Sequence, residues 1–250
     1  MKMDKNLLEK FNLVEQKHWW WEGRRKLIQN FIPKKKNLRV LDIGCGTGET
    51  LSFVKRIRPN SQVYGIDTMS LAVSYTKSRN HTKAYVASAM KLPFRDNFFD
   101  VLLYLDVLEH LKDHHKALME GKRVLKKGGV MIITCPALPF IISDFDKNQG
   151  HVRRYTKNDF LYLENKTGMK LKFLSYFNFI FSIPIIIVRV ASKIKYLSFL
   201  SNYDNGFNYN IADKSFINNL FRGIFLQEIG LMKHISYPLG ISIIAVYKKV

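Results

Sequence analysis

One run of residues, 40–48, constrains the fold of this chain more than any other. It reads Val-Leu-Asp-Ile-Gly-Cys-Gly-Thr-Gly, and Asp67 follows at the end of a second apolar run, Val63–Ile66. The residues before Gly44 suit a strand buried in a parallel sheet. The glycines allow a tight turn that a ligand can approach closely, and the helix that follows directs free N–H groups toward it. A carboxylate about 20 residues further on can accept hydrogen bonds from both ribose hydroxyls. We therefore expect a strand–turn–helix unit that binds a nucleoside-bearing cofactor.

The spacing of the glycines excludes two other nucleotide-binding loops. Gly44 and Gly46 fit the first two positions of the dinucleotide fingerprint G-x-G-x-x-G, but its third position is Glu49, whose carboxylate would repel a pyrophosphate. A Walker loop would end in Gly-Lys-Ser/Thr, and no such triplet follows. The pattern Asp42-x-Gly44-x-Gly46-x-Gly48 resembles instead the S-adenosylmethionine loop of the class I methyltransferases.

Further segments, spread over nearly the whole chain, resemble the type 11 and related type 23 branches of that family. They are residues 18–25 (HWWWEGRR), 87–94, 97–100, 101–111 (VLLYLDVLEHL), 123–134, 150–155 (GHVRRY) and 238–242 (PLGIS). The resemblance implies an α/β fold with a Rossmann-like, seven-stranded, mostly parallel sheet of order 3-2-1-4-5-7-6, with the last strand antiparallel and helices on both faces. It also implies an amino-terminal helical cap over residues 1–35 and a methyltransferase domain over 36–250, with a helical insertion at about 178–230 between the last two strands.

The resemblance also implies a set of residues that contact the cofactor S-adenosyl-L-methionine and its product S-adenosyl-L-homocysteine. In the glycine loop and at the end of the next strand these are Asp42, Gly44, Cys45, Gly46, Thr47, Gly48 and Asp67. The adenine is expected near Thr68, Met69, Ser88, Ala89 and Met90, and the methionine part beside Leu105 and Asp106. Relatives often carry an acidic residue where Ser88 stands, and a serine hydroxyl can still accept from the adenine amino group.

Two histidines are candidates for the general base. His110 follows the fourth expected strand, and an imidazole titrates near neutral pH, but a structural role at a helix end is an alternative. His151, Arg153 and Tyr155 would point to one face if their segment were extended. On that face they could bind an anionic acceptor, with His151 as the base. Alternatively, they form a loop clamp in which Arg153 pairs with an acidic neighbour.

The amino-terminal run His18-Trp19-Trp20-Trp21 allows two interpretations as well. Trp20 and Arg24 are expected to contact the cofactor or the acceptor; alternatively, the tryptophans simply hold the cap against the domain. The triplets Asp113-His114-His115 and Asp144-Phe145-Asp146 lack convincing metal-ligand partners in the sequence. We expect both to be solvated turns or helix starts, and we expect no metal.

Composition limits the compartment and the partners. The net charge is +20, from 40 Lys plus Arg against 20 Asp plus Glu, which attracts polyanions or merely keeps the surface soluble. Two cysteines support neither a disulfide framework nor a structural zinc site. The first residues lack the layout of a signal peptide, so we expect the cytoplasm, with peripheral attachment to an anionic membrane left open.

An uncharged tract of 16 residues, 173–188, precedes Arg189. It is shorter than the roughly 20 residues that span a bilayer, and Pro184 would interrupt a spanning helix. We expect a sixth strand through about Phe177 and then a helix that continues past Lys193 and Lys195 to about residue 200. This helix could lie in a membrane interface, cover the substrate pocket or pack in the core. A second helix is expected from about Asp213, its cap, to about residue 228.

These observations lead to one expected function and two alternatives. We expect methyl transfer from S-adenosylmethionine to an oxygen of a small-molecule or lipid/glycan-precursor acceptor. The charge suggests a nucleic-acid methyltransferase, but the Asn/Asp-Pro-Pro-aromatic tetrad of base-amine enzymes is replaced by Leu105-Asp106-Val107-Leu108, so nucleic acid is not favoured. The other alternative is a protein of the same fold that binds the cofactor without catalysis.

Overall fold

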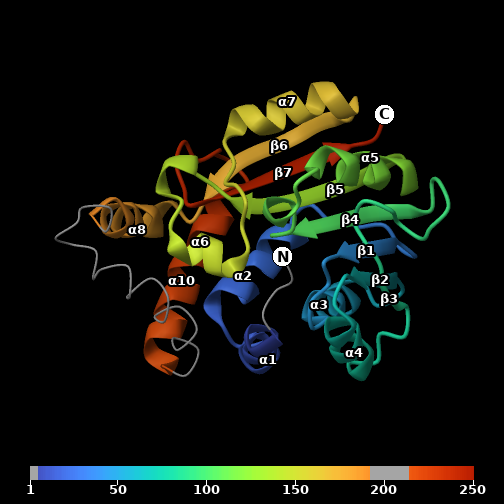
Figure 1. Cartoon of the computed structure of the whole chain (residues 1–250), viewed down its shortest axis with the longest axis horizontal. Coiled ribbons are helices and arrows are strands. Elements are labelled where there is room, and N and C mark those ends of the chain that lie inside the picture. The colour runs from blue at the N-terminus through green and yellow to red at the C-terminus, as the bar shows by residue number, and fades with distance from the viewer. Residues whose placement is uncertain (1–4, 192–213) are drawn as a thin grey trace.

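A seven-stranded sheet forms the centre of the computed structural model, which describes residues 5–191 and 214–250 (Figure 1). The strands are β1 (Arg39–Ile43), β2 (Gln62–Asp67), β3 (Ala84–Val86), β4 (Phe99–Leu105), β5 (Leu125–Pro136), β6 (Lys170–Phe177) and β7 (Ser242–Lys248). Their order is β3-β2-β1-β4-β5-β7-β6. The pairs among β1 to β5 are parallel, whereas β7 is antiparallel to both β5 and β6. The predicted fold class and strand order are confirmed.

The central strands are buried because helices cover the sheet. In β4, the side chains from Val101 to Tyr104 have no solvent exposure, and β1 is buried from Val40 to Ile43. Near-continuous apolar runs of this kind are typical of parallel strands with both faces covered. Removing these side chains from water is a main source of the stability of the fold.

Nine described helices and two 3-10 turns surround the sheet. They are α1 (Lys5–Val14), α2 (Trp19–Gln29), α3 (Glu49–Ile57), α4 (Ser70–Ser78), η1 (Leu108–His110), α5 (His114–Val124), η2 (Pro139–Ile141), α6 (Asp144–Gln149), α7 (Lys157–Thr167), α8 (Phe179–Ala191) and α10 (Ser215–Leu231). Figure 1 shows α7 along β6 at one edge of the sheet and α3 and α4 beside β2 and β3 near the other.

Helices are present in both regions where the sequence predicts additions to the sheet domain, before β1 and between β6 and β7. Helices α1 and α2 fall within residues 1–35, and α8 and α10 fall between β6 and β7, where the insertion is expected. The division into a cap, a domain and an insertion itself stays a prediction. The expected cap Asp213 and the expected continuation past Lys193 and Lys195 lie outside the described residues. No helix in the described ranges has the length and apolarity needed to cross a membrane.

Candidate active site

The carboxyl ends of β1, β2 and β4 open into a cavity of about 1210 Å³. The strand order reverses between β1 and β4, which is where open α/β sheets bind their ligands. Ligand pockets commonly measure roughly 300–1000 Å³. The cavity therefore has room for a nucleoside cofactor and a second small molecule together.

The glycine loop presents bare backbone to this cavity. Gly44 and Gly46 have φ angles of 73° and 53°, which favour glycine. The N–H groups of Gly44 and Cys45 donate to the carbonyl of Ile66, at 2.8 and 2.9 Å, and so fix the turn against β2. A Cβ added to Gly46 would meet no atom within 4 Å, so the space beside this residue is open. Such a bare backbone turn fits the close approach of a bulky ligand.

Asp67 closes the other side of the same turn. Its Oδ2 accepts from the N–H of Gly46 at 3.1 Å, and its Oδ1 accepts from the N–H of Met69 at 2.9 Å. Burial raises the pKa of Asp67, and the hydrogen bonds from Met69 and Gly46 oppose this shift. Each carboxylate oxygen keeps a further lone pair, so the side chain can still accept from two hydroxyl groups. This arrangement fits a ribose.

The structure brings together every predicted cofactor residue except one. Those that line the cavity are Asp42, Gly44, Cys45, Gly46, Thr47, Asp67, Thr68, Met69, Ser88, Ala89, Met90, Leu105 and Asp106. The exception is Gly48, which precedes α3 with a φ of 90° and lies against Thr76 instead. Ser88 faces the cavity, but its Oγ already accepts from the N–H of Met90 at 3.2 Å.

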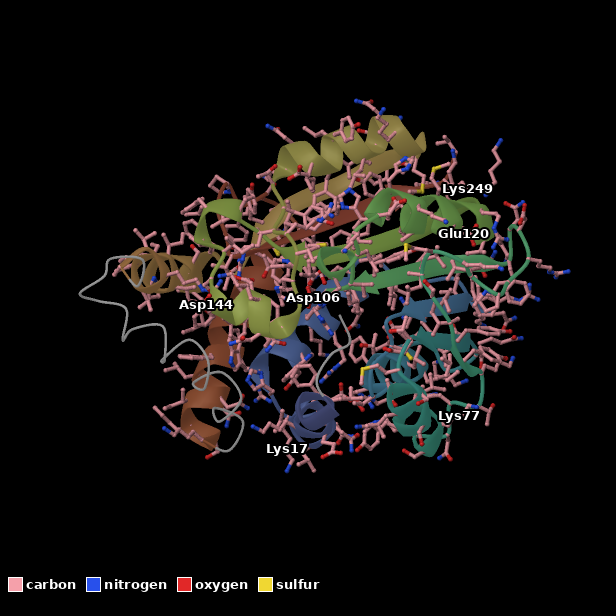
Figure 2. The ribbon with its side chains drawn as sticks, in the orientation of Figure 1. Lys17, Lys77, Asp106, Glu120, Asp144 and Lys249 are labelled. Carbon is pink, nitrogen blue, oxygen red and sulfur yellow. The ribbon has the colours of Figure 1, made fainter. Side chains whose placement is uncertain are left out.

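Buried charges surround the loop. Burial raises the pKa of Asp42 to about 8, although the charge of Arg24 opposes this shift. Arg24, on α2, forms an ion pair with Asp106 at the end of β4, and Thr134 Oγ1 donates to the same carboxylate at 3.1 Å. Figure 2 shows Asp106 near the middle of the molecule. Helix α2 thus supplies a charged group to the cavity.

The tryptophan run forms part of the cavity wall and also holds α2 in place. All three rings line the cavity. Trp20 stacks on Phe177 of β6 and Phe225 of α10, with ring centroids 5.8 and 5.9 Å apart, whereas Trp21 packs edge-on against Phe11 of α1 at 5.0 Å. Both interpretations drawn from the sequence are therefore compatible with the packing.

The two candidate bases meet in the same cavity. His110 lies in η1 and His151 follows α6, and their ring centroids are 4.9 Å apart. His110 Nδ1 lies 3.2 Å from the carbonyl of Gly150, which can only accept, so Nδ1 carries the proton and Nε2 carries the lone pair. Burial and the neighbouring His151 lower the pKa of His110.

Arg153 and Tyr155, which the sequence predicts as substrate contacts, do not line the cavity. Arg153 Nη2 donates to the carbonyl of Lys112 at 2.9 Å, and the buried Tyr155 hydroxyl lies 2.8 Å from His114 Nδ1. Residues 151–154 are not extended in a strand, so alternation along the segment does not hold. Within this segment, Arg154 is the arginine that lines the cavity.

Asp146, which is absent from the site residues predicted from the sequence, holds His151 and Arg154 of the cavity wall in place. Asp144 and Asp146 do begin a helix, as expected, but Asp146 is fully buried instead of solvated. It pairs with Arg154 Nη2 at 2.7 Å, His151 Nδ1 at 3.0 Å and Arg189 Nη1 at 3.5 Å. Burial alone would raise the pKa of Asp146, but the hydrogen bond from His151 and the charge of Arg154 hold it well below its usual range. The nearby sequence offers one indication that Asp146 makes contacts within the protein, which is the Ser143–Asp146 spacing of a capping box.

Comparison with known proteins places this geometry in a family context. Residues 41–133 match the family model described as "Methyltransferase domain". This part of the chain is thus similar to the class I methyltransferase domains. The cofactor of this class is S-adenosylmethionine, and the open Gly46 turn and the available acceptors of Asp67 fit it.

One similar sequence and two similar folds accompany this match. A demethylmenaquinone methyltransferase of Staphylococcus aureus is 33% identical over 132 residues, which is 50% of this chain and 54% of that protein. The chain thus matches about half the length of this curated relative. Phosphoethanolamine N-methyltransferase 2 of Haemonchus contortus, solved with S-adenosylhomocysteine, has a TM-score of 0.65 at 16% identity, covering 97% of this chain and 57% of that one. Geranyl diphosphate C-methyltransferase of Streptomyces coelicolor has a TM-score of 0.63 at 13% identity, covering 92% and 79%.

Proposed function

We propose that the protein transfers a methyl group from S-adenosylmethionine to an oxygen of a small-molecule or lipid-linked acceptor, such as a glycan precursor. The observation that carries this proposal is that one cavity joins the Gly46–Asp67 cradle to two histidines that can accept a proton. The family match over residues 41–133 supports methyl transfer. The choice of oxygen rests on the two imidazoles, since a hydroxyl acceptor must lose a proton and a general base assists this loss.

The residues of the chain would hold and orient the reacting groups and exclude water from them. When bound, the cofactor supplies a methyl group on a sulfonium centre. Asp67 and the backbone of Gly46 hold the ribose end, and the Nε2 atom of His110 or His151 accepts the proton of the acceptor hydroxyl. The aromatic and aliphatic side chains of α2, α8 and α10 exclude water, which favours a reaction in which charge is neutralised.

The wall opposite the glycine loop supports an amphiphilic acceptor. Helix α8 contributes Phe181, Ile185 and Val188 to the cavity, next to the charged groups of Arg154 and Arg189. An apolar portion of the acceptor could pack on the aliphatic side chains, and a polar or anionic portion could pair with an arginine. The solved methyltransferase of S. coelicolor carries geranyl diphosphate, which combines the same two kinds of group.

The outer face of α8 supports contact with a membrane surface. Ile180, Ile183, Ile187 and Val190 are 52%, 54%, 62% and 45% exposed, and their spacing places them on one stripe of the helix. Interfacial helices combine an apolar stripe of this kind with positive charge that attracts anionic lipid, and the chain carries a net charge of +20. A lipid-linked acceptor could then enter the cavity past α8.

A labelling experiment tests the proposal. The full chain is incubated with S-adenosylmethionine labelled in the methyl group and with a cell extract, which is then separated into lipid, small-molecule, protein and nucleic-acid fractions. We expect label in the lipid or small-molecule fraction, stable to base as an ether, and no label with the Asp67→Ala variant. Label confined to nucleic acid would reject the proposal, as would tight cofactor binding with no labelled product in any fraction.

A further inference from the structure

Three potential ligands for a metal ion converge on the acceptor side of the cavity. Glu109 and His110 lie in η1, and His151 follows α6, so two segments about 40 residues apart supply them. One ligand atom from each of the three residues lies within 4.8 Å of the others. All three residues line the cavity.

Both imidazoles are already oriented as metal ligands usually are. His110 Nδ1 faces the carbonyl of Gly150 at 3.2 Å, and His151 Nδ1 faces the carboxylate of Asp146 at 3.0 Å. Each acceptor fixes the proton on Nδ1 and leaves the Nε2 lone pair available. Metal-binding histidines almost always donate their other N–H to a carbonyl or carboxylate in this way. Arg154 and Arg189 in turn hold Asp146 in place.

The burial of the Glu109 side chain is an independent observation that indicates a bound ligand. Its side chain has no exposure to solvent, and neither carboxylate oxygen has an N–H or O–H partner among the described residues. The weakly donating thiol of Cys135 lies beside it. His151 Nε2 is 3.9 Å from Glu109 Oε1, which is too long for a hydrogen bond. A carboxyl group with only these weak or distant partners is costly to bury, and an ion held between Glu109 Oε1 and His151 Nε2 would remove that cost.

We propose that Glu109, His110 and His151 bind one divalent transition-metal ion, for which zinc is the best fit. Two imidazoles and one carboxylate, with a remaining position open to the cavity, form the ligand set of many catalytic zinc sites. Imidazole ligands favour zinc over magnesium or calcium, which prefer oxygen. In a tetrahedral site with bonds of about 2.1 Å the ligand atoms stand about 3.4 Å apart, so side-chain rotations that move them by about 1 Å complete the site.

The role of this ion rests on the proposed function. A hydroxyl of the acceptor would occupy the open position, and coordination would lower its pKa so that its proton passes to solvent near neutral pH. The oxygen lone pair then forms the new C–O bond as the C–S bond of the cofactor breaks, and the sulfur leaves as a neutral thioether. With the ion bound, the Nε2 atoms of His110 and His151 are ligands and the ion activates the hydroxyl. Without the ion, either imidazole is the candidate base, so an oxygen acceptor is expected in both cases.

Metal binding is measurable without any acceptor. The full chain, prepared without a polyhistidine tag and stripped with a chelator, is titrated with Zn²⁺ by calorimetry, and bound metal is counted by elemental analysis after dialysis. The Co²⁺ form is examined for the visible bands of a tetrahedral site. The variants are Glu109→Gln, His110→Ala and His151→Ala. His234→Ala is the matched control, because His234 is an exposed histidine after α10.

We expect the wild type to bind one Zn²⁺ per chain and to bind no Mg²⁺ with comparable affinity. Zn²⁺ binding should be at least tenfold weaker in each of the three variants and unchanged in the control. Wild-type protein that binds no Zn²⁺, or variants that bind it as the wild type does, would overturn the proposal. Circular dichroism and calorimetry with S-adenosylmethionine show whether each variant is folded. Failure of the metal site is thereby distinguished from failure of the proposed function, because cofactor binding and label transfer are read separately.

Discussion

Asp67 is the residue on which cofactor affinity most directly depends. Its carboxylate accepts from Gly46 and Met69 and keeps two positions for ribose hydroxyls. We expect Asp67→Ala to weaken S-adenosylmethionine binding at least tenfold, or by about 1.4 kcal/mol, because a pair of hydrogen bonds is lost. Calorimetric titration measures this. The exposed Asp144→Ala is the control and should bind as the wild type does; equal affinity in the two variants would contradict the role of Asp67.

We expect Glu15 to make the stability of the protein depend on pH. It accepts from Thr47 Oγ1 in the cofactor loop and pairs with Arg79 at 3.2 Å. Burial raises the pKa of Glu15 from 4.5 to about 7, although the charge of Arg79 opposes this shift. Between these two pH values the folded chain holds a proton that the unfolded chain has released, so the free energy of unfolding falls as pH rises.

The variant Glu15→Gln cannot titrate at this position, and comparing it with the wild type isolates the effect. From pH 4.5 to 7 the wild type should lose roughly 1–3 kcal/mol of stability relative to the variant. Urea unfolding of both proteins at pH 5 and pH 8 measures the difference. Glu9→Gln, on the same helix and exposed, serves as the control. A wild-type-minus-variant difference that does not change with pH would refute the assignment.

At the scale of elements, α8 is expected to govern membrane association. Its stripe of exposed isoleucines has no partner among the described residues, while its other face lines the cavity. We expect the double variant Ile183→Glu, Ile187→Glu to bind phosphatidylglycerol vesicles at least tenfold more weakly, since each buried isoleucine contributes roughly 1.5–3 kcal/mol. Vesicle co-sedimentation at low and high salt measures this.

The control for α8 is an apolar residue exposed on a different helix. Leu161 of α7 is 46% exposed and lies away from the cavity. Leu161→Glu should leave vesicle binding unchanged. If both variants lose binding equally, the effect comes from overall charge instead of from α8. If neither loses binding, α8 does not meet the membrane.

Elements with strong local signals could be predicted from the sequence, whereas contacts between distant segments could not. The glycine turn and Asp67 follow from apolar runs and spacing, whereas the strand order is what the family resemblance implies. Asp146 was mistaken for a solvated residue because its partners Arg154 and Arg189 are supplied by the loop after α6 and by α8. The alternation of side chains along an extended segment favours Arg153 over Arg154 as a substrate contact, but residues 151–154 do not form a strand.

At the scale of the whole molecule, helices α2 and α10, which are far apart in the sequence, pack against each other beside the cavity. The N–H of Trp19 donates to Asn218 Oδ1 at 2.9 Å, and Asn218 Nδ2 donates to the carbonyl of Lys17 at 2.8 Å. Arg222 pairs with Glu22 at 3.4 Å. Helices α2 and α10 therefore form one unit, although about 200 residues separate them. Because α2 also carries Arg24, this unit connects the stability of the fold to the geometry of the site.

Gly23 is where this connection can be tested. A Cβ at Gly23 would lie 2.1 Å from Cδ1 of Phe225, a fully buried ring that is stacked on Trp20. Because the ring is buried on all sides, we expect Gly23→Ala to cost about 1–3 kcal/mol of stability through overpacking. We also expect KM for the acceptor to rise as Arg24 shifts away from Asp106. Gly223→Ala is the matched control, because a Cβ at Gly223 of α10 meets nothing within 4 Å and should stabilise the helix by up to about 1 kcal/mol. Urea unfolding and steady-state kinetics measure both effects. A Gly23→Ala protein as stable as the control would mean that α2 and α10 do not pack as one unit.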